Sequence, residues 1–219
     1  MTQSAWNDRA EAYRTSAVHA GGADLDVVVE MCDPQPGLKV LDVATGGGHV
    51  ARRLREAGAE VVTVDPAAGM EPDVVAPAEH LPFPDGSFDV VVTRLAAHHF
   101  SSIGDAVGEL ARVSNRLVVV DDHDYVDEET EQAEKLRDPS HVRSYSADEW
   151  RELLGDAGLE VERVESFDMT IDFESWFART GTVPDVADRV RELLAPRTTD
   201  DGAHWLSPIV IFQARKSES

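Results

Sequence analysis

The sequence contains a single cysteine, and none of its apolar runs approaches the roughly 18 residues that a membrane-spanning helix requires. Cys32 therefore cannot form a disulfide within the chain, and its apolar neighbours predict a buried structural thiol rather than a nucleophile. The first residues include no basic segment followed by an apolar one, so we expect no signal peptide. Together these absences predict a cytoplasmic protein with no membrane partner.

Positive charge is also scarce, because 42 acidic residues face only 20 lysines and arginines and leave a formal net charge of −22. Such a chain repels the phosphates of nucleic acids and anionic lipid head groups, so we expect neither as a partner. The acidity fits a high-salt host, where screening relieves self-repulsion, and it fits a GC-rich genome equally well. The net charge is therefore informative about the solubility of the protein and says little about any reaction that it catalyses.

Apart from its charge, the chain has an ordinary globular composition, with 42% hydrophobic and 28% charged residues among 219. This length predicts one domain. Strand and helix patterns alternate along the chain, which predicts an α/β fold, a Rossmann-like and mostly parallel sheet with helices on both faces. We expect helices over residues 5–14 and 24–31, and strands over 39–43, 60–64, 88–93, 116–121, 159–164 and 209–214.

Two serines mark further expected helix starts, since Ser102 with Asp105 and Ser146 with Glu149 have the spacing of capping boxes. Two more helical segments are expected between residues 173 and 194. A helical insertion before the last strand forms a natural lid over the carboxyl ends of the strands. Open α/β sheets bind their ligands at those ends.

The sharpest local signal is the segment Val40-Leu-Asp-Val-Ala-Thr-Gly-Gly-Gly-His49, a buried strand that runs directly into glycines at the start of a helix. Glycines let a ligand approach the main-chain amides because no Cβ intervenes. Asp65 closes the next strand, 23 residues after Asp42, where a carboxylate accepts the hydroxyls of a ribose. The combination predicts a nucleotide-like ligand.

Two ligand classes share this pattern and differ in charge. A dinucleotide-binding loop has the spacing G-x-G-x-x-G and cradles a pyrophosphate. Here the third glycine is missing at the required place, and the carboxylate of Asp42 would repel a pyrophosphate. The cationic amino acid portion of S-adenosyl-L-methionine tolerates an acid, so we favour this cofactor. A nicotinamide-dependent oxidoreductase remains the less favoured alternative.

Four segments carry a family resemblance: VLDVATGGGHVA, VVTVDPAAGM, AEHLPFPDGSFDVVVTRLAAHHF and RDPSHVRSYSADEWRELLGDAGLEV. In order, they resemble the motifs of class I S-adenosylmethionine-dependent methyltransferases, and more narrowly the ubiquinone/menaquinone-biosynthesis-type (methyltransferase type 11) group. The resemblance runs from about His19 to the last strand. It implies direct in-line methyl transfer to a small-molecule acceptor and leaves the acceptor open.

The resemblance also divides the single domain. Residues 1–33 would form an N-terminal helical cap and residues 34–122 the cofactor-binding core. Residues 123–145 and 172–200 would be lid or substrate segments, and residues 201–215 the last strand. We expect a monomer or a homodimer.

The resemblance further implies cofactor contacts at individual positions, from the methionine portion through the ribose to the adenine and the acceptor side. These positions are Asp42, Ala44, Thr45, Gly46, Gly48, Asp65, Pro66, Ala67, Ala78, Glu79, Arg94 and Leu95, with Tyr13 and His19 closing over the cofactor from the cap. One departure concerns Pro77, which stands where relatives have an aspartate. Another is the shortened stretch between Met70 and Ala78, which trims one edge of the sheet.

Four histidines are candidate catalytic bases: His98, His99, His19 and His123. In-line displacement at a methyl group depends mainly on positioning, and a base is needed only if the acceptor atom must lose a proton. Each histidine could instead pack or orient a loop. His98 and His99 are adjacent and should face in different directions.

Three other clusters have a functional and a structural interpretation. Asp121, Asp122, His123 and Asp124 offer ligands for Mg²⁺, but we favour a solvated acidic face and expect no metal. Arg137, His141 and Arg143 suit an anionic acceptor group or surface salt bridges, and we favour the latter. Phe173, Trp176 and Phe177 suit the packing of a lid better than a substrate wall. A noncatalytic cofactor-binding or protein-interaction module is the alternative to an enzyme.

Overall fold

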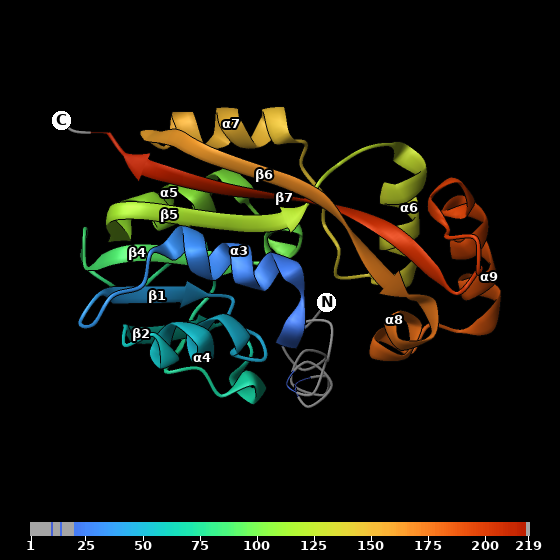
Figure 1. Cartoon of the computed structure of the whole chain (residues 1–219), viewed down its shortest axis with the longest axis horizontal. Helices are drawn as coiled ribbons and strands as arrows, with labels where there is room; N and C mark the ends of the chain where they lie inside the picture. Colours follow the sequence, from blue (N-terminus) through green and yellow to red (C-terminus); the bar gives the residue numbers. More distant parts are fainter. Residues whose placement is uncertain (1–9, 11–13, 15–19, 218–219) are drawn as a thin grey trace.

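A seven-stranded sheet forms the centre of the computed structural model, which describes residues 10, 14 and 20–217 (Figure 1). The strand order is β3-β2-β1-β4-β5-β7-β6. Neighbours among the first five strands are parallel, whereas β7 is antiparallel to both β5 and β6. The predicted Rossmann-like α/β sheet is confirmed.

The strands are β1 (Lys39–Val43), β2 (Glu60–Asp65), β3 (Val74–Val75), β4 (Phe88–Arg94), β5 (Ser114–His123), β6 (Leu159–Asp172) and β7 (His204–Lys216). The helices are α3 (Ala23–Cys32), α4 (His49–Glu56), α5 (Ile103–Val113), α6 (Glu128–Arg137), α7 (Ala147–Asp156), α8 (Phe173–Thr180) and α9 (Pro184–Leu193). Three short 3-10 helices are η1 (Ala68–Met70), η2 (Ala97–His99) and η3 (Ala195–Arg197). The trimmed sheet edge expected after Met70 is the two-residue strand β3.

Helices cover both faces of the sheet, because side chains alternate along each strand. Val40, Val90 and Val92 pack with α3 and α4 in one cluster of buried side chains. Leu41 and Val91 point to the opposite face, where they pack with α5 and α7. The valine-rich strands are therefore buried on both faces, as expected for a parallel sheet.

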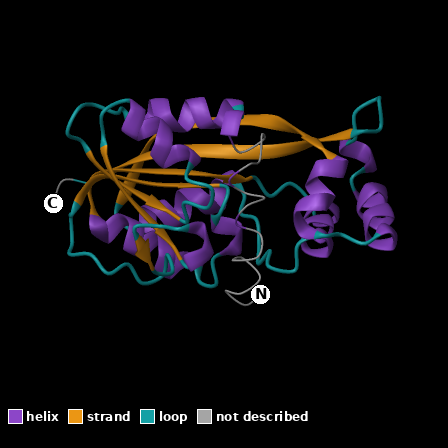
Figure 2. Ribbon diagram, turned by 90° about the horizontal axis from the view of Figure 1, so that it is seen from below, coloured by secondary structure: helices purple, strands orange, loops and turns teal. Residues whose placement is uncertain are grey.

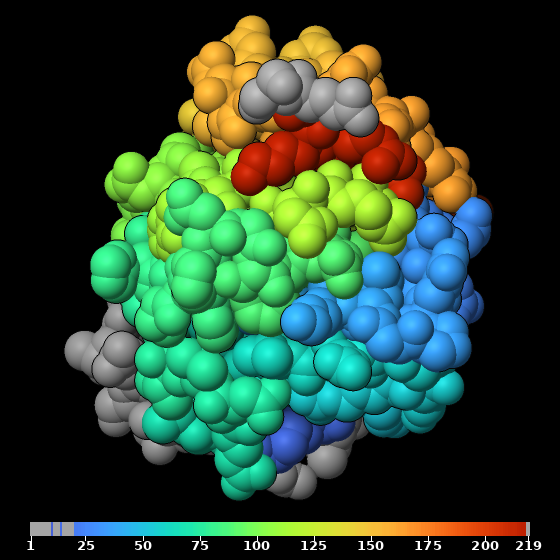
Figure 3. All heavy atoms as spheres, turned by 90° about the vertical axis from the view of Figure 1, so that its left-hand side faces the viewer, coloured from blue at the N-terminus to red at the C-terminus, as the bar shows by residue number. Residues whose placement is uncertain are grey.

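The last two strands are longer than the sequence analysis predicted. Their antiparallel pairing runs from Leu159 opposite Lys216 to Asp172 opposite His204. Seen from the end away from α8 and α9, the red C-terminal strand lies between orange and yellow-green segments (Figure 3). At the other end β6 and β7 reach past the sheet and carry α8 and α9 (Figures 1 and 2).

These extended strands and three helices, α6, α8 and α9, form one packed region, and the helices lie within the segments 123–145 and 172–200 that were expected as lid or substrate segments. Phe173, Trp176, Phe177 and Trp205 are buried in it, and they belong to the same hydrophobic cluster as the residues under α3. The expectation that the three aromatic residues at 173–177 are packing residues is therefore confirmed. None of the described helices is long and apolar enough to cross a membrane.

Helix α6 lies in an acidic stretch and is not among the helices expected from the sequence. The Asp127 side chain caps it by accepting a hydrogen bond from the Thr130 amide. Three glutamates stand in its first turn and two basic residues in its last, an arrangement that complements the helix dipole. The acids therefore favour a helix here.

Only one of the two predicted capping boxes forms. Ser146 accepts a hydrogen bond from the Glu149 amide at 3.3 Å, and the Glu149 carboxylate accepts one from the Ser146 amide at 2.9 Å. The prediction for Ser102 is wrong, because its side chain makes no cap hydrogen bond. Its partner at the third helical position is Asp105, which is shorter than the Glu or Gln that this motif requires.

We predict that Ser146→Ala lowers the free energy of unfolding by about 1 kcal/mol, since it leaves a first-turn amide of α7 without its acceptor. Urea unfolding monitored by circular dichroism measures the change. Ser102→Ala is the matched control, because it removes a serine at a helix start where no cap bond exists. Equal losses in the two variants would contradict the prediction.

Candidate functional site

A cavity of about 410 Å³ lies at the carboxyl ends of β1, β2 and β4. The sheet order reverses between β1 and β4, and this is the point where open α/β sheets bind ligands. Ten of the residues predicted to contact a cofactor line the cavity: Asp42, Ala44, Thr45, Gly46, Asp65, Pro66, Ala78, Glu79, Arg94 and Leu95. One predicted catalytic residue, His99, lines it as well.

Several predicted positions lie elsewhere. Gly48 is the N-cap of α4, and Ala67 is buried and does not line the cavity. His98 and His123 are not in the cavity lining. Tyr13 and His19 lie outside the described residues. Arg14 does lie near the site, since its guanidinium donates to the Gly69 carbonyl at 2.9 Å.

Sequence reasoning missed the remaining part of the lining. These residues are Gly47, His49, Val50, Met70, Pro77, Ala96, Phe100 and Ser101. Most of them directly follow or precede a predicted residue, so extending each motif by one or two positions would have found them. Pro77 was seen only as a departure from the family, yet it forms part of the wall.

The turn between β1 and α4 needs left-handed backbone conformations. Gly46 and Gly48 have φ angles of 50° and 72°, and Ala44 adopts a φ of 55° despite its Cβ. A Cβ on Gly46 would have no heavy atom within 4 Å, so a side chain would meet no steric clash there. Glycine is favoured at this position because of the left-handed backbone conformation. The strained Ala44 stands at the cavity wall, where such strain is common in functional sites.

Two buried carboxylates hold this turn in place. Asp42 Oδ2 accepts from Thr45 Oγ1 at 2.7 Å and from the Ala51 amide at 3.1 Å. Asp65 Oδ2 accepts from the Gly46 amide at 3.0 Å, and its Oδ1 accepts from the Ala67 amide at 2.8 Å. Burial raises the pKa of Asp42 to about 6 against the opposing hydrogen bonds, and burial likewise raises the pKa of Asp65.

Glu79 joins two loops at the edge of the cavity. Its Oε1 accepts from the Ser101 amide at 2.7 Å, from Ser101 Oγ at 2.8 Å and from the Ser102 amide at 3.3 Å. Burial alone would raise the pKa of Glu79, but the hydrogen bonds from Ser101 and Ser102 lower it. The cavity therefore has three acidic side chains in its wall.

Arg94 lies between two fully buried acids. Its Nε donates to Asp24 Oδ2 at 2.5 Å and lies 3.6 Å from Asp121 Oδ2. The contact ties helix α3 to the ends of β4 and β5. Burial, followed by the charge of Asp24, raises the pKa of Asp121 well above its usual range, against the opposing charge of Arg94.

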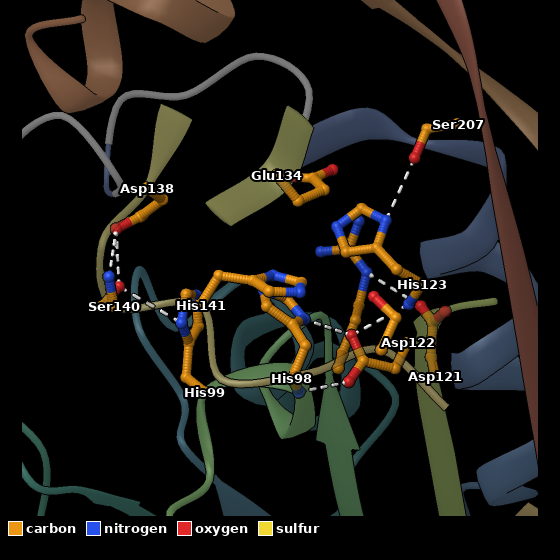
Figure 4. Close-up of polar contacts among 12 residues, drawn as sticks. His98, His99, Asp121, Asp122, His123, Glu134, Asp138, Ser140, His141 and Ser207 are labelled. Atoms are coloured by element: carbon orange, nitrogen blue, oxygen red, sulfur yellow. Dashed lines mark hydrogen bonds and ion pairs between the residues drawn. The ribbon is translucent and has the colours of Figure 1, made fainter. Parts of the chain in front are cut away.

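The interpretation of residues 121–124 as a solvated face is wrong, because Asp121 and Asp122 are buried. Asp122 Oδ2 accepts from the His98 amide at 2.6 Å, and its Oδ1 lies 2.5 Å from His98 Nδ1 (Figure 4). The same Oδ1 accepts from the His123 amide at 2.9 Å. One side-chain atom each of His98, Asp122 and His123 lies within 4.8 Å of the others, whereas Asp121 points toward Arg94.

Arg137 and His141 are also buried, which contradicts surface salt bridging for these two residues. The His141 ring stacks on that of His98 with centroids 5.2 Å apart, and its Nε2 lies 3.1 Å from Glu131 Oε2. Arg137 lies over the Trp176 ring at 4.4 Å. Arg143 alone is exposed, and it pairs with Glu149. These three side chains therefore have different environments and do not form one anion site.

Adjacent histidines face in different directions, as predicted. The His98 ring is directed to Asp122, whereas His99 Nδ1 lies 3.2 Å from Ser140 Oγ (Figure 4). His123 Nδ1 lies 3.0 Å from Ser207 Oγ. Among the described histidine candidates, His99 is the one in the cavity lining.

Comparison with known proteins agrees with this geometry. A model of the methyltransferase domain family matches residues 19–164. The chain is 34% identical over 211 residues to the uncharacterized methyltransferase YcgJ of Bacillus subtilis, with 86% of this chain and 82% of the relative covered. The crystal structure of YcgJ has a TM-score of 0.82 at 28% identity and covers 91% of this chain and 100% of that one. The chain belongs to the class I methyltransferases.

The order of the strands, the position of the cavity and the match to the family model thus agree with one another. The class I fold implies binding of S-adenosylmethionine. A demethylmenaquinone methyltransferase of Thermus thermophilus is 39% identical over 102 residues, covering 38% of this chain and 46% of that relative. This similarity agrees with the expected menaquinone-type resemblance. The aligned part covers less than half of either chain, so the similarity does not assign the substrate of the relative to this protein.

We predict that Asp42→Asn makes the stability of this methyltransferase less dependent on pH. The folded pKa of about 6 lies above the unfolded value of 3.8, so the carboxyl stabilises the fold when protonated, and this contribution is lost as pH rises through 6. Between pH 5 and pH 7.5 the loss amounts to about 1 kcal/mol.

Urea unfolding at half-unit pH steps measures the difference between wild type and variant. Both donors to Asp42 use Oδ2, so the asparagine oxygen can keep both hydrogen bonds. The other acids with raised pKa values titrate in both proteins and largely cancel. Parallel pH profiles would show that Asp42 is not the titrating group.

Proposed function

We propose that this protein is an S-adenosyl-L-methionine-dependent methyltransferase that acts on a small-molecule acceptor by direct in-line transfer. The observation that carries the proposal is the cavity at the end of β1, walled on two sides by the buried carboxylates of Asp42 and Asp65. When bound, the cofactor supplies an electrophilic methyl group on a sulfonium. The chain supplies binding, orientation and exclusion of water.

The residues present fit this cofactor in both chemistry and charge. An ionised carboxylate has about four acceptor sites, and the two loop amides occupy only two of those on Asp65. Asp65 can therefore receive ribose hydroxyls while it still holds the turn. Asp42, Asp65 and Glu79 favour a cation in the cavity and disfavour a pyrophosphate.

Structural neighbours support the same cofactor. A phosphoethanolamine N-methyltransferase of Haemonchus contortus, solved with S-adenosylhomocysteine, shares the fold at 18% identity with a TM-score of 0.62. Since the fold also occurs in a [4+2]-cyclase at 17% identity, fold alone does not determine the reaction. The acidic cavity of this chain is therefore the stronger support for the cofactor.

The deciding experiment is calorimetric titration of the purified protein with S-adenosylhomocysteine and, separately, with NAD⁺. We expect a response to the first alone. The titrations are run at low and at molar salt, because repulsion within a chain of net charge −22 can destabilise the fold when salt does not screen it. Binding of NAD⁺ without a response to S-adenosylhomocysteine would instead favour an oxidoreductase.

We predict that Asp65→Ala weakens S-adenosylhomocysteine binding 10- to 100-fold, because it removes charge-assisted hydrogen bonds to the ribose worth about 1.5–3 kcal/mol. Calorimetry measures the dissociation constant, and circular dichroism checks that the turn between β1 and α4 survives. Glu60→Ala, an exposed position at the start of the same strand, is the control. An unchanged dissociation constant in Asp65→Ala would remove the ribose role.

We predict that alanine at His98 and at His99 has unequal effects on turnover of labelled donor, measured with the acceptor that a metabolite library identifies. His99→Ala should lower turnover at least about 100-fold if it acts as a base. His98→Ala should act mainly on stability, because it breaks the buried contact with Asp122. Wild-type rates in both variants would exclude both as bases, and no turnover with any acceptor would favour a noncatalytic module.

A further inference from the structure

The segment 138–143 between α6 and α7 lies directly against the histidines that follow β4. The amides of Val142 and Arg143 both donate to the His98 carbonyl, at 2.8 and 3.2 Å. These bonds fix the segment beside η2, whose last residue is His99. They place Asp138 and Ser140 next to the wall of the cavity.

Asp138, Ser140 and His99 form a hydrogen-bonded chain that ends at the cavity (Figure 4). Ser140 Oγ donates to Asp138 Oδ1 at 2.6 Å, and the Ser140 amide donates to the same oxygen at 3.0 Å. His99 Nδ1 lies 3.2 Å from Ser140 Oγ. Asp138 is fully buried and Ser140 nearly so.

The donors and acceptors of these three side chains determine which atom donates in each hydrogen bond. An ionised carboxylate only accepts, and a hydroxyl has one proton to donate. Burial alone would raise the pKa of Asp138, but the hydrogen bonds from Ser140 lower it to about 2. The hydroxyl proton therefore goes to Asp138, and Ser140 Oγ must accept from His99.

His99 then has its proton on Nδ1, so its Nε2 is a hydrogen-bond acceptor and a base. Burial, followed by the neighbouring His98, holds the pKa of His99 well below its ordinary value, so the ring is neutral at neutral pH. A hydrogen bond with the Ser140 backbone and the charge of Asp138 favour the charged form of His99, whereas His141 opposes it. His99 therefore brings a neutral imidazole with an acceptor nitrogen to the cavity lining.

We propose that Asp138 and Ser140 are positioning residues that hold His99 in its Nδ1–H tautomer, and that Nε2 takes a proton from an acceptor with a hydroxyl or an acidic carbon. The inference rests on the proposed function and deepens it by naming the acceptor class. An acceptor such as a tertiary amine has no proton to give and needs no such base.

The step balances without a further reactant. The acceptor atom forms a bond to the methyl carbon as its own proton moves to His99 Nε2. The electron pair of the broken sulfur–methyl bond stays on sulfur, which loses its positive charge. The imidazolium of His99 then releases its proton to water, and the ring returns to the neutral tautomer.

The test observes the tautomer itself and needs no acceptor. Long-range ¹H–¹⁵N correlation spectra of protein with ¹⁵N-labelled histidine, at pH 7.5, distinguish a protonated Nδ1 from a protonated Nε2. His99→Asn assigns the signal. We expect the Nδ1–H form in the wild type and a measurable shift of population toward the Nε2–H form in Ser140→Ala, in which the Ser140 backbone remains.

Three further variants make the test specific. Ser140→Thr keeps the hydroxyl and should keep the Nδ1–H form, and Asp138→Asn weakens the acceptor and should reduce that form without removing the serine. Ser207→Ala removes a serine hydroxyl that contacts a different histidine, His123, so it should change His123 and leave His99 unaltered. An Nε2–H tautomer of His99 in the wild type, or an unchanged tautomer in Ser140→Ala, would overturn the proposal.

Failure of this inference is separable from failure of the proposed function. Calorimetry with S-adenosylhomocysteine should give the same dissociation constant for Ser140→Ala as for wild type, since Ser140 does not line the cavity. With hydroxyl or acidic-carbon acceptors, Ser140→Ala should lower kcat about 10-fold or more while the KM for the donor stays constant. Undiminished kcat in that variant would contradict the positioning role, even if the cofactor binds.

Discussion

The burial of negative charge at the carboxyl end of the sheet is the constraint on which this site depends. Asp42 and Asp65 accept hydrogen bonds from the turn that follows β1, and these bonds offset part of the cost of removing two carboxylates from water. The turn also contains left-handed residues that such bonds must hold in place. The carboxylates of Asp42 and Asp65 therefore determine both the shape of the turn at the cavity and the negative charge of its wall.

The same principle extends across the neighbouring strands, where buried ionisable groups are paired with one another rather than with solvent. Asp24 and Asp121 flank Arg94, and Asp122 holds His98. Removing one member of such a pair leaves a charge without compensation, which costs far more than the pair itself contributes. In a chain with so many acids, these contacts specify which helix and which strand end meet at the site.

The fold was predictable from the sequence where the signal is local, and so was much of the cavity wall. The strand, glycine turn and Asp65 follow each other within 30 residues, and each has a distinct pattern. The extensions of β6 and β7 were missed because their outer halves pair with each other and with no further strand of the described sheet, and because their apolar residues alternate with polar ones. Burial of Asp121 and the different environments of His98 and His99 depend on partners 24 to 97 residues away, such as Asp122, Ser140 and Asp24. Patterns within a short stretch of sequence cannot identify partners at such separations.

Strand β7 lies inside the sheet, between β5 and β6, although it is the last strand along the chain. During synthesis on a ribosome, β5 must therefore wait with an open edge until residues 204–216 have left the exit tunnel. The native partner of that edge is β7, which belongs to the hairpin of β6 and β7 with α8 and α9 between them. Until then the unpaired N–H and C=O groups of β5 form an edge on which a strand of another chain can pair, so the risk of aggregation is confined to the time before β7 emerges.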